Sequence, residues 1–174
     1  MNEYFKIILT SGLTVIGGVL VYIVGQIISK LFLDPINAQS KAIEDISETL
    51  VYYANTYSNP TVDINQFNIN KDYQETRQAL RKRASVLVAR TNAVKCYSFF
   101  VKNNFVLSRN TINKVSEDLI GLSNNLHIYT HGKPESLQDA IAKNNGLVLE
   151  IRNLLGLPEM KDDENKKSNE TISE

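Results

Sequence analysis

Few residues in this 174-residue chain have the type and spacing that metal binding requires. His127 and His131 are four positions apart, a spacing that places two ligands on one face of a helix. Two ligands do not complete a coordination shell, and residues 130–134 (Thr-His-Gly-Lys-Pro) have the composition of a turn. The sequence therefore predicts no metal ion.

Catalysis through a nucleophile or an acid–base pair has no better support. The one cysteine, Cys96, lies in no motif that would pair it with a histidine, so the default expectation is a buried thiol acting as a small apolar group. Carboxylates adjoin one another in runs such as Glu44-Asp45 and Glu117-Asp118, and neighbouring positions on a helix point in different directions. The chain contains no Walker loop, Gly-x-Ser-x-Gly or His-Glu-x-x-His motif. We expect no catalysis and no cofactor.

One region of the chain is densely basic. Its members are Arg77, Arg81, Lys82, Arg83 and Arg90. Such a cluster can bind the phosphate of a nucleic acid or nucleotide, or an acidic protein partner. It can equally be a solvated helix face whose charges pair with Asp72, Glu75 or a neighbouring helix. The formal net charge of the chain is zero, which makes nucleic acid an unexpected partner. We keep the cluster as a candidate surface for an unidentified protein partner.

The longest element that the sequence predicts is an apolar segment near the N-terminus. Residues 7–33 carry one charge, Lys30, and follow a short tail of residues 1–6. A helix needs about 20 apolar residues to cross about 30 Å of hydrocarbon. A signal peptide would have a shorter apolar core and a small-residue cleavage site, and an amphipathic surface helix would have a face rich in Lys or Arg. A core helix of a soluble protein would rarely be this long without a charge. The segment therefore predicts one membrane-spanning helix, with the lipid bilayer as its partner.

Small residues recur within this span. Ser11, Gly18 and Gly25 are spaced by seven positions, so a helix would present them along one face. Small residues let two helices approach closely in lipid, which predicts a homo-oligomer. The alternative is that glycine is simply common in membrane helices.

The charges flanking the span favour a cytoplasmic position for the C-terminal part of the chain. Lys30 and Lys41 follow the span, whereas Lys6 precedes it. Lysine and arginine close to a span are more frequent on the cytoplasmic side. A single cysteine also suits a reducing compartment.

The remaining residues predict an all-α domain. Residues 34–157 are long enough for one core and show helical rather than alternating periodicity. We expect four amphipathic helices, at residues 34–58, 72–102, 109–128 and 136–155, arranged as an antiparallel four-helix bundle. Spacings of three and four residues place Leu50, Leu80, Leu119 and Leu137, among others, on the inward faces of these helices. Asp34 and Pro35 would open the first helix, and Ser136 with Asp139 would cap the last. Residues 158–174 have little apolar surface to bury, so we expect a disordered charged tail.

Three local features carry further expectations. Residues 60–71 should form a loop whose apolar side chains (Val62, Ile64, Phe67 and Ile69) pack on the domain. Residues 144–146 (Asn-Asn-Gly) could kink the last helix. The up-and-down path would bring four aromatic residues close to the bilayer: Tyr97, Phe99, Phe100 and Phe105. Packing in the core is the alternative for these rings.

A weakly specific set of motifs accompanies this plan. It comprises Asp34-Pro35, residues 52–55 (Tyr-Tyr-Ala-Asn), Cys96-Tyr97 and residues 119–126 (Leu-Ile-Gly-Leu-Ser-Asn-Asn-Leu). In these motifs the chain resembles a group of small bacterial membrane proteins with one N-terminal span and a helical domain. The resemblance implies a cytoplasmic helical domain behind one membrane span, and it points to no particular activity.

Two functional hypotheses follow. In the first, the protein is a membrane-anchored helical interaction or adaptor module at the bacterial inner membrane, and its cytoplasmic domain binds a protein partner. In the second, it is an oligomerising membrane effector that perturbs the bilayer. The span has no charges that would line a pore, which disfavours a stable ion channel.

Overall fold

The computed structural model describes residues 3–128 and 136–158. Within these ranges the regular structure is helical, apart from one isolated bridge between Thr61 and His127. The predicted all-α class is confirmed. The predicted tail 158–174 lies outside the described residues except for Pro158.

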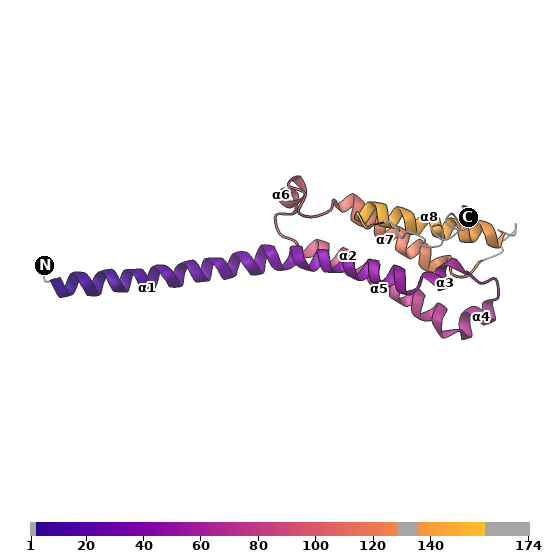
Figure 1. Ribbon diagram of the computed structural model, residues 1–174, viewed down its shortest axis with the longest axis horizontal. Helices are drawn as coiled ribbons and strands as arrows, with labels where there is room; N and C mark the ends of the chain where they lie inside the picture. The colour runs from indigo at the N-terminus through magenta and orange to yellow at the C-terminus, as the bar shows by residue number, and fades with distance from the viewer. Residues whose placement is uncertain (1–2, 129–135, 159–174) are drawn as a thin grey trace, which may run out of the picture.

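The N-terminal third of the chain is one rod. Its parts are α1 (Glu3–Ile28), a π-helical turn named η1 (Ser29–Leu33) and α2 (Asp34–Tyr52). Figure 1 shows α1 projecting alone from the packed helices. The described part of the expected N-terminal tail, residues 3–6, belongs to α1.

Pro35 accounts for the π-helical turn. Proline has no N–H, and its ring would clash with the carbonyl four residues earlier in a regular helix. The preceding turn is wider instead, and the Asp34 N–H donates to the carbonyl of Ser29, five residues back. We expected Asp34 to cap a new helix. That expectation was wrong, because Leu33 is already helical and no side chain caps α2. The apolar helix and the domain are therefore joined without a break.

The described residues hold six further helices. They are α3 (Ala54–Ser58), α4 (Ile64–Ile69), α5 (Lys71–Ala93), α6 (Tyr97–Lys102), α7 (Arg109–Asn124) and α8 (Leu137–Leu155). Helix α5 packs against both α2 and α7, and α7 packs against α8. In Figure 1, α3 and α4 lie at the end of the domain remote from α1, whereas α6 lies near the junction of α1 and α2. We call these the distal end and the proximal end.

The first three predicted helices were too long. The first breaks at Tyr53, before α3 begins. The second ends at Ala93, because Cys96 adopts a left-handed backbone conformation (φ 50°) that an α-helix cannot contain. The third ends at Asn124, because the chain beyond it turns to pair with the distal loop: the Thr61 N–H donates to the Leu126 carbonyl at 3.0 Å.

The segment predicted as a loop holds a short helix, α4, capped by the Asp63 side chain at 2.8 Å from the Asn65 N–H. Of the apolar side chains expected to pack on the domain, only Phe67 is buried. Val62, Ile64 and Ile69 are exposed, so the expectation was wrong for them.

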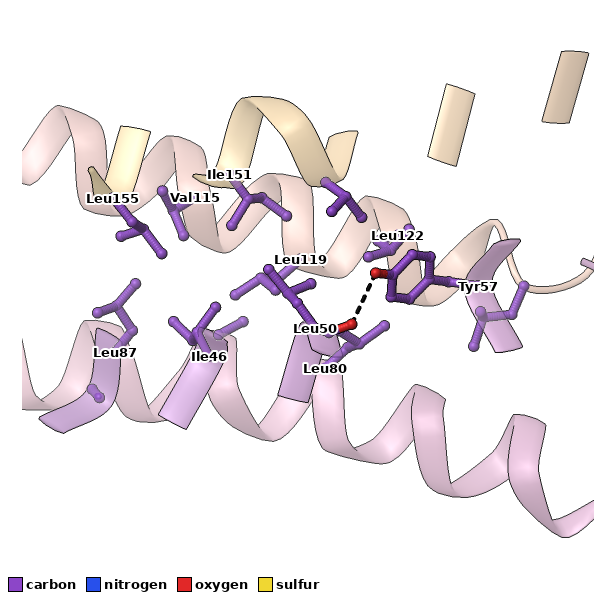
Figure 2. Packing of buried hydrophobic residues seen from close by; sticks show 14 of the residues in the cluster. Ile46, Leu50, Tyr57, Leu80, Leu87, Val115, Leu119, Leu122, Ile151 and Leu155 are labelled. Atoms are coloured by element: carbon purple, nitrogen blue, oxygen red, sulfur yellow. Dashed lines mark hydrogen bonds between the residues drawn. The ribbon is translucent and has the colours of Figure 1, made fainter. Parts of the chain in front are cut away.

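The core is formed where α2, α5, α7 and α8 meet (Figure 2). Leu50, Leu80 and Leu119 are fully buried, as the helical spacing predicted for each of them. Tyr57 closes the core at the distal end, where its hydroxyl donates to the Leu50 carbonyl at 2.8 Å. Burial raises the pKa of Tyr57 above 10.0. The folded state thus holds this proton more tightly, and its stability falls as the pH rises above 10.0.

Helix α8 begins and ends as predicted but is not kinked. Ser136 and Asp139 form a capping box, and Gly156 ends the helix with φ 66°. Asn144 is fully buried and its side chain donates to the Tyr57 carbonyl at 2.8 Å. This contact holds residues 144–146 within a continuous helix. Leu137, expected in the core, is half exposed because it lies at the solvent end of the first turn.

Candidate interaction sites

The apolar helix is the largest candidate surface. It is long and apolar enough to cross a membrane, and none of its most apolar window is buried against the rest of the structure. No residue of α1 is buried. Such a helix is not part of this chain's own hydrophobic core, although length and composition alone do not separate a membrane span from a signal sequence.

The predicted self-association stripe is open. A Cβ atom added at Gly18 or Gly25 would meet no atom within 4 Å. The same holds for Gly12 and Gly17, which lie on other faces of α1. Another helix could therefore approach the backbone at any of these glycines, and the seven-residue spacing alone distinguishes the stripe with Ser11.

The structure divides the basic cluster between two faces of α5. Two members contact α2: Arg83 donates to Asp45 at 3.0 Å and to Thr49 at 2.9 Å, and Arg90 donates to the Ala38 carbonyl at 3.0 Å. These contacts are of the kind in which a basic residue pairs with a neighbouring helix. They hold α5 to α2, the continuation of the apolar helix.

Arg77 and Arg81 lie on the opposite side of α5. Arg81 donates to Ser123 at 3.2 Å and to Asn124 at 2.6 Å, and so ties α5 to the end of α7. The Arg77 guanidinium lies 5.8 Å from the Phe67 ring centroid, and Lys82 is exposed. The five residues therefore form no single patch, and a role in partner binding stays a prediction.

A pocket of about 300 Å³ opens at the distal end. Two cations, Arg77 and Lys143, line it together with polar groups of Ser123, Asn124, Asn125 and His127. Among the described lining residues there is no carboxylate. The arrangement suits an acidic side chain, because the Arg77 guanidinium can pair with a carboxylate and the amides can donate further hydrogen bonds. No local sequence pattern predicts this pocket, because its residues come from four separate helices: α4, α5, α7 and α8.

The described structure does not bring the candidate metal-binding and nucleophilic residues together as a site. His127 lies beyond the end of α7 in the bridge with Thr61, and His131 lies outside the described residues. In the described ranges no three His, Cys, Asp or Glu side chains gather as metal ligands would. Cys96 is exposed rather than buried, because its left-handed backbone turns it out of the path of α5.

A charged contact between α7 and α8 was also missed. Lys114 lies 2.9 Å from Asp118 and 3.2 Å from Glu150. The hydrogen bond to Asp118 is the main cause that raises the pKa of Lys114 above 10.5. The four-residue spacing of Lys114 and Asp118 was a usable signal, whereas the contact with Glu150 depends on the packing of two helices.

Comparison with family models, curated proteins and solved structures found no match to this chain. The resemblance to small bacterial membrane proteins therefore stays a prediction.

Proposed function

We propose that this protein is a membrane-anchored interaction module of the bacterial inner membrane. Helix α1 spans the bilayer, and α2, α5, α7 and α8 form an antiparallel four-helix bundle in the cytoplasm. The bundle binds a protein partner through its distal end.

The observation that carries the proposal is the continuous helix from Glu3 to Tyr52. Its first half exposes apolar side chains throughout, and its second half buries Ala42, Ile46 and Leu50 in the domain core. An apolar rod joined to a folded domain without a flexible linker is suited to anchoring that domain at a fixed place. A cleaved signal sequence would require a cut through this helix near its junction with the domain, and every residue from 29 to 33 is helical.

The orientation gains support from the fold. Helix α6 lies at the proximal end, so Lys95 and Lys102 join Lys30 on the C-terminal side of the span. Basic residues close to a span favour the cytoplasmic side.

The distal end is suited to a partner. Helix α2 has 19 residues, which places its end about 28 Å beyond the span at about 1.5 Å per residue. At this end α4 exposes Ile69 to 83%, and Arg77 lines the neighbouring pocket. A segment with acidic and apolar side chains would match both features.

Replacement of Ile69 by glutamate should weaken partner binding, because a charge cannot fill an apolar contact. Loss of one apolar anchor costs about 2 kcal/mol, which is about 30-fold in affinity. The test is chemical cross-linking in intact cells, affinity purification of the full chain from membranes, and mass spectrometry. Ile69→Glu and Arg77→Glu should each lose the same protein that the parent chain recovers.

Asn113→Glu is the matched control. Asn113 is exposed on α7, and replacing it by glutamate introduces a negative charge elsewhere on the domain. This variant should recover the partner in parental amounts. Recovery of an identical set of proteins by all four chains would refute binding at the distal end.

The alternative function, an oligomerising membrane effector, is favoured by the open glycines. Replacing Gly18 and Gly25 together by isoleucine should reduce cross-linked oligomers to monomers, because branched side chains prevent close helix approach. The control is the pair Gly12→Ile and Gly17→Ile, which adds the same bulk on other faces. Equal cross-linking of both variants would remove the stripe as an interface, and toxicity on overexpression would favour the effector over the adaptor.

A further inference from the structure

An aromatic cluster lies where the apolar helix enters the domain. The ring centroid of Phe100 is 6.1 Å from that of Phe32, which belongs to the turn at the end of α1. Phe100 also makes edge-to-face contacts with Phe99 and Phe105, with ring centroids 5.3 Å and 6.3 Å apart. We call these four rings the proximal aromatic cluster. It joins α6 to the end of the apolar rod.

The outer rings of this cluster are not packed in the core. Phe99 and Phe105 are each 62% exposed, and Phe100 is half-buried. The sequence left open whether these rings pack in the core or approach the bilayer. Within the described structure, core packing is wrong for Phe99 and Phe105. Large apolar groups held in water at one place on a protein usually mark a contact surface.

The segment that presents these rings is firmly held. Its ends are anchored by the buried side chains of Val94 and Val106. Tyr97 ties the segment to the residues that follow it: its hydroxyl donates to the Leu107 carbonyl, and the Arg109 guanidinium lies 4.9 Å from its ring centroid. The exposure of Phe99 and Phe105 is therefore a consequence of the fold rather than of a loose loop.

Charge in this segment suits a membrane surface. Residues 94–108 contain two lysines, Lys95 and Lys102, and no acidic residue. Both lysines are exposed. An anionic bilayer surface attracts lysines that lie close to it.

The depth of Phe32 also fits. Residues 7–32 form about 39 Å of helix at about 1.5 Å per residue, more than the hydrocarbon thickness of about 30 Å. Phe32 therefore reaches the interfacial layer when α1 spans the bilayer. Phenylalanine, leucine and tryptophan are the side chains that interfacial helices insert at this depth.

We propose that the proximal aromatic cluster is a second membrane contact, in which Phe99 and Phe105 insert into the leaflet that α1 leaves. The occupant of this exposed face is lipid, because the face continues the apolar surface of α1 through Phe32. Two attachments at one end fix the tilt of the domain, which a single span leaves free to vary. This inference rests on the proposed function, since it requires α1 to span the bilayer.

The chain has no tryptophan, so one introduced tryptophan reports on its own position. The test uses four single variants of the full chain: Phe99→Trp, Phe105→Trp, Val21→Trp within α1 and Ile69→Trp at the distal end. Each is reconstituted into vesicles of phosphatidylcholine and phosphatidylglycerol whose acyl chains carry bromine, a contact quencher of tryptophan fluorescence. Matched vesicles without bromine give the unquenched signal.

We expect the Phe99→Trp and Phe105→Trp variants to lose fluorescence to an extent comparable with Val21→Trp, and Ile69→Trp to lose none. Quenching of Val21→Trp without quenching of Phe99→Trp or Phe105→Trp would overturn the second contact and leave the anchor intact. If those two variants were shielded from aqueous acrylamide but not quenched by bromine, protein such as a second copy would cover the face, which also overturns it. No quenching of Val21→Trp would overturn the proposed anchor itself.

Discussion

Replacing Val19 and Leu20 together by arginine is expected to release the full chain from the membrane fraction. Both residues lie near the middle of the apolar span and are exposed on α1. An arginine at the centre of a spanning helix costs about 2.5–3.5 kcal/mol on insertion scales, so two cost about 5–7 kcal/mol. That cost shifts the equilibrium far from insertion. Flotation of membranes on a density gradient measures the change.

The control adds the same two charges outside the span. Val51 and Val62 are exposed apolar residues at the distal end, and replacing them by arginine changes no lipid contact in our account. This variant should float with the membranes as the parent chain does. Flotation of the Val19→Arg, Leu20→Arg variant in parental amounts would contradict a spanning α1.

The second large effect is expected in the domain core. Leu119 on α7 is fully buried in the cluster that joins α2, α5, α7 and α8 (Figure 2). Replacing it by alanine leaves a cavity, which costs about 2–5 kcal/mol of unfolding free energy. Urea unfolding of the full chain in detergent micelles, followed by far-ultraviolet circular dichroism, measures the loss.

Ile120 gives a matched control on the same helix. It is the next residue and is 41% exposed, so Ile120→Ala should cost less than about 1 kcal/mol. Equal losses for Leu119→Ala and Ile120→Ala would show that the core does not lie on the predicted face of α7.

Local patterns in the sequence predicted much of this fold. The apolar run gave α1, and spacings of three and four residues placed Leu50, Leu80 and Leu119 in the core. The capping pair Ser136 and Asp139 marked the start of α8. Each of these signals depends on neighbours within one or two helical turns, which a sequence displays directly.

The errors came from contacts between distant segments. Helix α7 was predicted too long because the pairing of Leu126 and Ile128 with Thr61 is invisible in a single segment. Asn144 suggested a kink, but its hydrogen bond to the Tyr57 carbonyl stabilises a straight helix. Pro35 was expected to mark the start of a new helix, but the widened turn before it lets the preceding helix continue.

The candidate sites divide in the same way. The basic residues were visible in the sequence, but only packing shows that Arg83 faces α2 and that Arg81 faces α7. The distal pocket collects residues from four helices and has no local signature. The sequence suggested that the aromatic residues near Phe100 approach the bilayer. The structure shows the ring of Phe100 in contact with that of Phe32 at the end of the apolar helix, and the approach to lipid stays a prediction.

The central claim is that lipid surrounds α1, and washing of membranes with alkaline carbonate tests it most directly. Carbonate strips proteins that are held at a membrane surface and leaves spanning helices in place. After ultracentrifugation we expect the full chain in the pellet, together with a known integral membrane protein. Its appearance in the supernatant would contradict the account, because an exposed apolar rod of this length would then have to be covered by protein.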